Sequence, residues 1–298
     1  MKNLFALLTV VLLFSACDDG DIILTSFDFD DAPLELCGGP GSYVFFKINA
    51  ASAESISLRL GTTDSLFFET DTLSFVLDGT THFVNYRKYS GEITNAYFCN
   101  SIPPTSPEVA VNYLGASGDA ILYTTAFKDD LDGLPVDVEE AQNDTDNDGL
   151  LNYFDADDEG DNVPTAAELD TQNADNDDNP LTNPLDTDGD GAPDYLDTDD
   201  DNDGVLTRYE DTNGDLDPRN DINDPEVGPN YLNPAVTLET VIDEYRLHSY
   251  DLTSDIRLVL SNVVLVGENE EIIQETLNMG EKADVVAVTI LVYPPFIN

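Results

Sequence analysis

The sequence "DTDDDNDGVLTRYE" at residues 197–210 decides how the middle of this chain folds. Its aspartates are so closely spaced that their charges repel one another, and such a segment stays unfolded in water unless a cation neutralises it. Every second residue from Asp199 to Asp203 is an aspartate, Gly204 follows directly, and Glu210 comes seven residues after Asp203. We therefore predict that this segment folds around a bound ion.

The spacing is that of a twelve-residue EF-hand calcium loop. In such a loop, side chains at positions 1, 3 and 5 converge on the ion, glycine at position 6 allows a sharp turn, and a carboxylate at position 12 closes the shell. Thr207 at position 9 joins the predicted ligands. Oxygen donors without Cys or His favour calcium over zinc or copper, and magnesium needs fewer protein oxygens. A disordered acidic linker, the alternative, would need neither the glycine nor the closing acid.

This loop belongs to an internal duplication. Residues 144–168 align with residues 186–210 at a shift of 42 residues without a gap, which indicates two copies of one structural unit. Each copy contains two abutting loops, so four loops are expected. Asn162 replaces glycine at position 6 of one loop and can also adopt a left-handed conformation. The predicted calcium ligands are Asp144, Asp146, Asp148, Asp155, Asp157, Glu159, Asp161, Glu168, Asp186, Asp188, Asp190, Asp197, Asp199, Asp201, Asp203, Thr207 and Glu210.

A further loop of the same pattern is degenerate. The segment "FKDDLDGLPVDVEE" has Asp130, Asp132 and Glu139 in phase with the other loops, but Lys128 stands at position 1. Because a cation at this position opposes the binding of a second cation, we predict no working site here.

Serial D-x-D-x-D-G loops over residues 129–217 resemble thrombospondin type 3 repeats. The resemblance implies a calcium-organised segment with little hydrophobic core, of a kind that often forms a spacer in surface proteins. Two features depart from the animal repeats. Their cysteine pairs are absent, and the glutamate at position 12 of the second loop in each copy is closer to an EF-hand. The resemblance and the loop spacing together predict that the chain binds several calcium ions, which have a structural role.

The first 17 residues, "MKNLFALLTVVLLFSAC", predict export. An apolar run from Leu4 to Phe14 follows Lys2 and is too short to cross a bilayer, which is typical of a secretory signal. Small residues directly before Cys17 resemble the lipobox of bacterial lipoproteins, which implies an acyl anchor on Cys17 that inserts into a lipid bilayer. A soluble secreted protein is the alternative.

The acidic residues 18–21 after this cysteine are similar to the surface-export signal of Bacteroidota lipoproteins. The resemblance implies a lipid-anchored protein of the outer membrane at the cell surface, with attachment to the periplasmic face as the alternative. In an oxidising compartment the two remaining cysteines, Cys37 and Cys99, are expected to form a disulfide rather than two buried thiols.

Alternating apolar and polar residues on both sides of the acidic block predict β-strands. Ile56, Leu58 and Leu60 share one face of such a run, and similar runs recur about every ten residues up to residue 127, which is typical of a β-sandwich. The strands after residue 236 are too few for an independent domain. We expect them to pack on or pair with the N-terminal strands, with the acidic block inserted between, and separate domains are the alternative.

The predicted organisation is therefore mainly β. It comprises a signal peptide with its lipobox cysteine (1–17), an acidic tether (18–30), a β-sandwich (31–128), a calcium-binding repeat block (129–226) and a C-terminal β segment (227–298).

Composition limits the function. The net charge is -50, more than half of the 61 acidic residues lie within residues 129–226, and the sequence has no Lys/Arg-rich segment, which excludes nucleic acid as a partner. The two histidines, His82 and His248, lie in strand-like runs and are expected to be surface or core residues. The sequence contains no nucleophile motif, phosphate loop or zinc-binding helix.

We therefore predict a non-enzymatic envelope protein in which calcium loops form a rigid scaffold. The scaffold would present the β module for binding or adhesion to a glycan, a matrix component or an outer-membrane protein. The alternative is an accessory enzyme, a prolyl isomerase or a glycan hydrolase, with its site in the β domain. A hydrolase would need an aromatic hollow with two carboxylates about 5 to 9 Å apart.

Overall fold

The computed structural model describes residues 27–139, 143–169 and 179–296. Cys17, the predicted signal peptide and most of the predicted acidic tether lie outside these residues. The chain divides into two compact units. The β unit comprises Met1–Asp64, Ser74–Ile121 and Leu258–Gly280, and the loop unit comprises Ser65–Leu73, Leu122–Arg257 and Glu281–Asn298.

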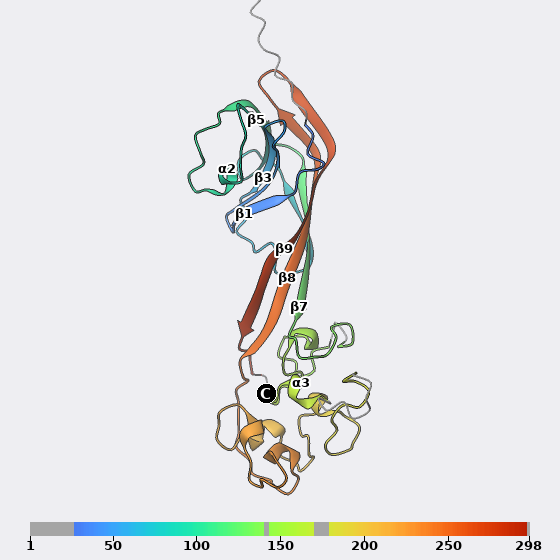
Figure 1. Ribbon diagram of the computed structural model, residues 1–298. Coiled ribbons are helices and arrows are strands. Elements are labelled where there is room, and N and C mark those ends of the chain that lie inside the picture. The colour runs from blue at the N-terminus through green and yellow to red at the C-terminus, as the bar shows by residue number, and fades with distance from the viewer. Residues whose placement is uncertain (1–26, 140–142, 170–178, 297–298) are drawn as a thin grey trace, which may run out of the picture. The chain divides into compact units, whose positions relative to one another are not determined.

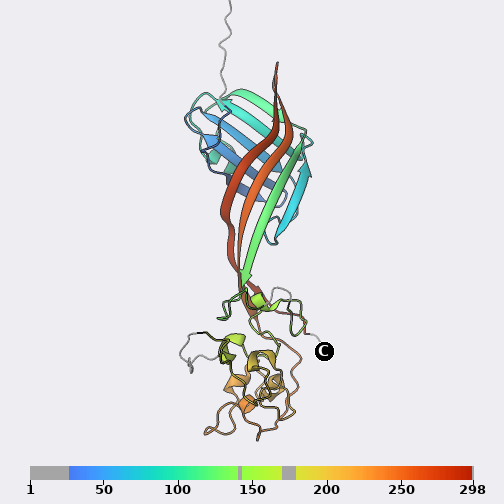
Figure 2. The same cartoon turned by 90° about the vertical axis from the view of Figure 1, so that its right-hand side faces the viewer.

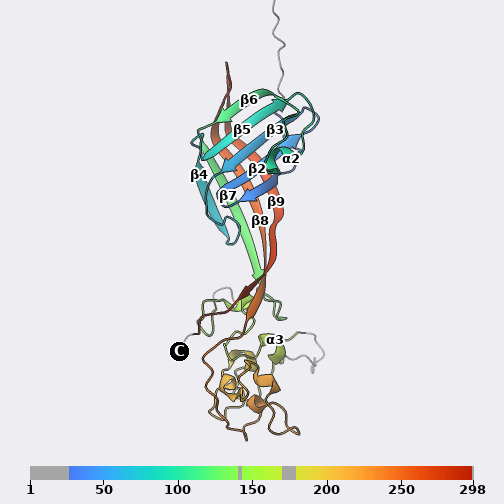
Figure 3. The ribbon, with the colours of Figure 1, turned by 90° about the vertical axis from the view of Figure 1, so that its left-hand side faces the viewer.

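The strands form one nine-stranded sheet in the order β1-β2-β3-β5-β6-β8-β7-β4, with β9 paired to β8 (Figure 3). Every pairing from β1 through β6 to β8 is antiparallel. The prediction of a mainly β protein with an irregular acidic middle is confirmed. The strands are β1 (Glu35–Gly39), β2 (Ser42–Asn49), β3 (Glu54–Leu60), β4 (Asp71–Val76), β5 (His82–Tyr89), β6 (Val109–Gly115), β7 (Asp119–Asp129), β8 (His248–Val266) and β9 (Glu271–Val292).

Strand β3 is buried on both faces over most of its length. Ile56, Leu58 and Leu60 are fully buried, as their alternation predicts. The other face is covered at Ser55 and Ser57, whereas Arg59 on the same face is exposed. Ser55 lies on this face, is fully buried, and hydrogen-bonds through its hydroxyl with Tyr89 OH at 3.1 Å.

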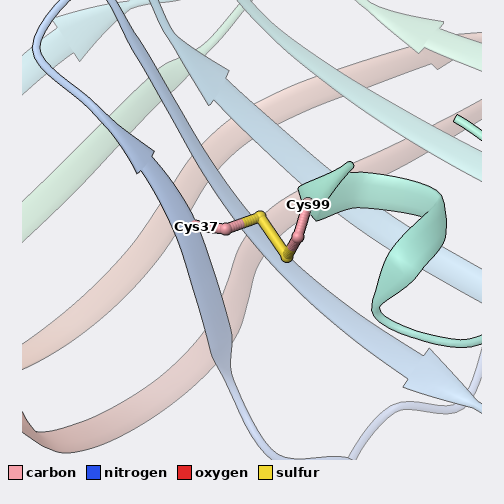
Figure 4. Close-up of a disulfide and its surroundings, with 2 residues drawn as sticks. All are labelled: Cys37 and Cys99. Carbon is pink, nitrogen blue, oxygen red and sulfur yellow. A yellow bond between two sulfur atoms is a disulfide. The ribbon is translucent and has the colours of Figure 1, made fainter. Parts of the chain in front are cut away.

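A short helix, α2 (Ala96–Cys99), lies beside β1 and β2. Phe98 stacks on Phe46 with ring centroids 4.3 Å apart. Cys99, the last residue of α2, is bonded to Cys37 of β1, with their Cα atoms 5.5 Å apart (Figure 4). The predicted disulfide is confirmed, and closing a separation of 62 residues contributes about 4 kcal/mol in the chain-entropy model.

The C-terminal strands complete the same sheet, as predicted. Strand β8 pairs with β6 through Leu114↔Val266 and Gly115↔Leu265. Gly115 is closely packed, because a Cβ there would stand 3.0 Å from the side chains of both Leu265 and Val263, which would have to shift to admit it. Strand β8 also lies between β7 and β9 (Figure 2, green, orange and red). The acidic block is therefore a single excursion between the neighbouring strands β7 and β8.

The helical elements described between β7 and β8 are all short (Figure 1). The buried residues of this segment include many aspartates and glutamates, whereas buried apolar side chains such as Phe154 and Val163 are few. None of the described helices is long and apolar enough to cross a bilayer. The short elements are η1 (Asn152–Phe154), α3 (Thr165–Glu168), η2 (Asp194–Leu196), η3 (Thr207–Glu210), η4 (Pro218–Asn220) and η5 (Asn230–Leu232).

Candidate metal centres

Five loops of the loop unit share one backbone conformation. They are loop A (128–139), loop B (144–155), loop C (157–168), loop D (186–197) and loop E (199–210). In each loop, positions 4 and 6 have positive φ, which side-chain-bearing residues rarely adopt. At position 6, φ is 110° at Gly133, 101° at Gly149, 74° at Asn162, 101° at Gly191 and 94° at Gly204. At position 4, the positive φ falls on Leu131, Asn147, Gly160, Gly189 and Asn202.

Hydrogen bonds that recur in these loops hold the carboxylates. The backbone N–H at position 7 donates to the carboxylate at position 5, at 2.7 or 2.8 Å in all five loops. In loops A, B, D and E, the N–H at position 5 donates to the carboxylate at position 3, at 2.8 to 3.2 Å. Each aspartate that accepts one of these bonds uses one carboxylate oxygen for it, and its other oxygen can accept a further partner.

Many of the second oxygens are buried and have no hydrogen-bond partner within the described chain. Every carboxylate oxygen of this kind lies in loop A, B, C or E. An uncompensated buried charge costs several kcal/mol, so these oxygens require a cation or a proton. Apart from His248, which lies beside two acids of loop B, the donors are oxygens, and oxygen donors fit a hard divalent cation. The residues concerned are Asp130, Asp132, Glu139, Asp144, Asp146, Asp148, Asp158, Glu159, Asp161, Glu168, Asp199, Asp200, Asp201, Asp203 and Glu210.

The segment that follows, residues 211–221, provides an internal comparison. Leu216 has a positive φ of 64°, and its N–H donates to the Asp211 carboxylate at 2.7 Å, so the turn is similar. Here, however, the Asn220 amide donates to both oxygens of Asp215, at 3.3 and 3.0 Å. Asp215 is also exposed, so its carboxylate has both an amide partner and access to solvent, and the buried second oxygens of loops A, B, C and E have neither among the described residues.

Loop C is the most deeply buried of the five. Asp157, Glu159 and Asp161 each place one oxygen within 4.8 Å of the others. Glu168 at position 12 is 1% exposed, and neither of its oxygens has a partner among the described residues. Burial and mutual repulsion raise the pKa of Glu159, Asp161 and Glu168 well above their ordinary values. A cation among them would remove that repulsion and hold all of them ionised.

Asp200 reaches loop C from loop E. One oxygen each of Asp161, Glu168 and Asp200 lies within 4.8 Å of the others, and Asp200 is 1% exposed. Asp200 stands at position 2 of its own loop, a position that is not among the predicted ligands. The signal is present in the alignment of the two copies, because position 2 is aspartate in both second loops, at Asp158 and Asp200, and threonine in both first loops.

Loop B receives a side chain from strand β8. Asp144, Asp146 and Asp148 form one cluster, and Asp148, Asp155 and His248 form a second, each with its donor atoms within 4.8 Å. His248 Nδ1 lies 2.7 Å from Asp155 Oδ1. Burial raises the pKa of Asp155 to about 8 and lowers the pKa of His248. His248 is therefore a buried residue, one of the two roles expected for it, and its imidazole faces the acids of loop B.

Loop E is closed by Glu210, which lies at the end of η3. Its carboxylate is buried and unpartnered within the described chain, and burial together with repulsion by Asp201 and Asp203 raises its pKa to about 9. Asp199, Asp201 and Asp203 each add one buried oxygen without a partner. All four predicted acids of this loop are thus brought together.

Loop D has the same turn but is open to solvent. Asp186 and Asp190 are exposed, and Asp188 accepts a hydrogen bond from the Asn202 amide at 2.8 Å. Asp197 at position 12 accepts the backbone N–H of Asp199 at 3.1 Å. Of the four predicted loops, loop D encloses its carboxylates least.

The residue at position 9 of each predicted loop hydrogen-bonds back to the start of the loop. Its N–H donates to the carbonyl of the residue before the loop, at 2.9 to 3.1 Å in loops B to E. In the second loops its hydroxyl accepts the N–H of position 2, from Asp158 to Thr165 and from Asp200 to Thr207, both at 3.2 Å. Thr207 thus has a visible role in closing loop E, and its role as a calcium ligand stays a prediction.

The β unit contains a hollow of about 480 Å³ beside β6. Its lining includes Tyr113, Glu268 and Glu270. Tyr113 donates a hydrogen bond to Glu270, which raises the tyrosine pKa to about 12. An aromatic ring and two acids therefore lie around one hollow.

The loops described above lie in the irregular region between β7 and β8, and their buried acidic clusters are consistent with calcium-binding loops. No protein-family model, no curated protein and no solved structure matches this chain.

Proposed function

We propose that this protein is a non-enzymatic, calcium-organised envelope protein whose serial loops form a stiff scaffold for its β unit. The observation that carries the proposal is the set of buried carboxylate oxygens without described partners in loops A, B, C and E. Asp215 of the neighbouring turn differs, because it is exposed and accepts two hydrogen bonds from the Asn220 amide. A segment with so many buried carboxylates is expected to be strongly stabilised when cations bind.

Calcium is the ion that these donor sets favour. Calcium takes six to eight oxygens at about 2.3 to 2.6 Å, which suits several carboxylates, a backbone carbonyl and a closing glutamate. Extracellular modules of this type bind calcium at about 0.1 to 1 mM. External calcium would then keep the sites filled, and the role of the ions would be structural, as in thrombospondin type 3 repeats.

The proposed location is the outer membrane, with an acyl chain on Cys17 as the anchor. The lipobox-like sequence, the acidic residues 18–21 and the Cys37–Cys99 disulfide support export from the reducing cytosol. Metabolic labelling with a fatty-acid probe tests the anchor, because Cys17→Ser should abolish the label. Protease added to intact cells then distinguishes the cell surface from the periplasmic face.

The scaffold is proposed to present the β unit to a glycan, a matrix component or an outer-membrane protein. Its support is the contrast between the two units. The β unit has an apolar core and a disulfide, whereas the loop unit buries acids. A cross-linked pull-down from intact outer membranes, with and without calcium, identifies the partner class.

Limited proteolysis tests the calcium scaffold directly. In millimolar calcium the full chain should resist cleavage, whereas in chelator the cuts should fall within residues 130–232 and the hydrodynamic radius should increase. Magnesium at the same concentration serves as the control and should protect much less. Identical cleavage patterns and radii with and without calcium would refute the stiffening role.

An accessory envelope enzyme is the second candidate, and the hollow around Tyr113, Glu268 and Glu270 is the observation in its favour. A glycan hydrolase would use the two glutamates as its acid pair. Cleavage of oligosaccharides that is lost in both Glu268→Gln and Glu270→Gln would favour this candidate. Proline isomerisation in a model peptide tests the isomerase version in the same samples.

A further inference from the structure

Loop A has the backbone of an ion loop although lysine stands at its position 1. Leu131 and Gly133 have positive φ values of 65° and 110°. The N–H of Asp132 donates to Asp130 at 2.9 Å, and the N–H of Leu134 donates to Asp132 at 2.7 Å. This is the bonding of loops B, D and E. The turn therefore holds two aspartates in the positions that a bound ion requires.

The lysine has partners of its own. Lys128 Nζ lies 2.9 and 3.2 Å from the two carboxylate oxygens of Glu69. It also lies 4.7 Å from the centre of the Phe154 ring. A carboxylate and an aromatic face already compensate the ammonium charge. The expectation that Lys128 disables loop A rested on repulsion between its charge and a bound cation, and in the structure this charge is paired with Glu69.

Three acids of loop A converge. Asp130, Asp132 and Glu139 each place one oxygen within 4.8 Å of the others. Asp132 and Glu139 are both 7% exposed, and each has a buried oxygen without a partner in the described chain. Burial, followed by repulsion from Asp132, raises the pKa of Glu139 to about 8. Both side chains are more than nine-tenths buried, and each directs an unpartnered oxygen into the same cluster.

A fourth acid comes from loop C. Asp158 is 2% exposed, and its Oδ1 has no partner among the described residues. Burial raises its pKa to about 9, and the nearby charge that raises it most is that of Asp132, a residue of loop A. Asp158 corresponds in the second copy to Asp200, which joins an acidic cluster of the earlier loop C. Asp200 thus lies among acids of an earlier loop, and Asp158 is close enough to loop A for the charge of Asp132 to raise its pKa.

We infer that Asp130, Asp132, Glu139 and Asp158 form a further divalent-cation site, in which a carboxylate of loop C replaces the missing position-1 ligand of loop A. The candidate ligand atoms are the unpartnered Asp130 Oδ2, Asp132 Oδ2, Glu139 Oε1 and Asp158 Oδ1. Four carboxylates without nitrogen or sulfur select a hard ion, and calcium is the ion of that class that tolerates an irregular shell. The assignment of calcium to this site rests on the proposed calcium-binding function. It would join the end of β7 to the first repeat copy.

Counting bound calcium on the full chain by native mass spectrometry tests the site. Asp158→Asn and Asp132→Asn should each hold one ion fewer than the wild type. Lys128→Ala should hold the wild-type number, because the lysine has no part in the site. Asp215→Asn is the matched control, since Asn220 already satisfies that carboxylate, and it should also hold the wild-type number.

The outcomes separate this site from the broader proposal. A wild-type chain that binds no calcium overturns both. A wild-type chain that binds calcium, with the same number of ions in Asp158→Asn and Asp132→Asn, overturns the loop A site alone. Because Asp158→Asn changes a residue of loop C and can disturb that loop, Asp132→Asn decides. Loss of one ion in Asp132→Asn, with the far-ultraviolet circular dichroism unchanged, supports the site.

Discussion

His248 of strand β8 lies with its Nδ1 atom 2.7 Å from Asp155 Oδ1, the closing acid of loop B. Both side chains are about 99% buried. The contact joins two segments of the loop unit that are far apart in the sequence, one from a regular strand and one from a turn. It shows how a repeat copy without a large apolar core is fastened to the rest of its unit.

His248→Ala is expected to destabilise the loop unit by about 1 to 3 kcal/mol, because it leaves the buried Asp155 without its nearest described partner. Urea unfolding in saturating calcium measures the effect. His82→Ala is the control, since His82 is only half-buried and accepts one hydrogen bond, from Gly61 N–H at 3.3 Å. Equal losses in both variants would contradict a specific role for His248.

Without calcium, the stability of the loop unit should fall as the pH rises. Folding raises the pKa of Glu139 to about 8 and of Asp158 and Glu210 to about 9, chiefly through burial. A group whose pKa is raised by folding holds its proton more tightly in the folded state, so its contribution is full at low pH and is lost as the pH passes the folded value.

Urea midpoints of chain stripped of calcium on a chelating resin should therefore be higher at pH 5 than at pH 9. Added calcium should reverse this trend, because the ion needs the ionised carboxylates. A stripped chain that is most stable at pH 9 would show that these acids are charged and compensated without metal.

Asp200→Asn should weaken ion binding at loop C, although Asp200 belongs to loop E. Its carboxylate shares a cluster with Asp161 and Glu168, and removing its charge is expected to lower the affinity of one site about tenfold or more. Calcium titration followed by calorimetry measures the change. Asp215→Asn, which lies outside the unpartnered clusters, should titrate like the wild type.

Asn162 is expected to stabilise the loop unit more than a glycine at the same position would. Its φ is 74°, its side-chain oxygen accepts the N–H of Arg246 at 2.9 Å, and its amide donates to the carbonyl of Glu244 at 3.1 Å. Asn162→Gly keeps the turn and loses two hydrogen bonds, about 1 kcal/mol each. Asn162→Ala should cost about 1 to 2 kcal/mol more, because alanine resists the left-handed region. Thermal unfolding in calcium ranks the variants, and equal losses would refute the backbone argument.

Reduction of the Cys37–Cys99 disulfide should loosen α2 without affecting the calcium loops. Cys37→Ser with Cys99→Ser is expected to lower the stability of the β unit by about 2 to 4 kcal/mol. The number of bound ions should not change, since both cysteines lie in the β unit and all five loops lie in the loop unit. Differential scanning calorimetry and native mass spectrometry on the same sample check both statements.

The features that could be predicted from the sequence are those set by neighbouring residues. The alternation of Ile56, Leu58 and Leu60 is local, and so is the spacing from Asp199 to Glu210. Both produced the expected strand and the expected turn. Even the exception at Asn162 was predictable, because the conformational preference of a residue type does not depend on distant partners.

The features that were missed depend on contacts between distant segments. The second face of β3 is buried at Ser55 and Ser57, which alternation alone does not reveal. Asp200 and His248 join acidic clusters through the packing of one loop, or one strand, against another. The aspartate at position 2 of both second loops, Asp158 and Asp200, was visible in the repeat. Its role could not be predicted, because it depends on contacts between loops that are distant in the sequence.

The position of the acidic block between two neighbouring strands has an evolutionary consequence. Because the chain departs from β7 and returns at the adjacent β8, a whole 42-residue copy can be gained or lost without changing the order or register of any strand. The entropic penalty of lengthening such a connection grows only logarithmically. Tandem growth by gene duplication is therefore structurally permitted here, and the gapless match between residues 144–168 and 186–210 is what one such event would leave behind.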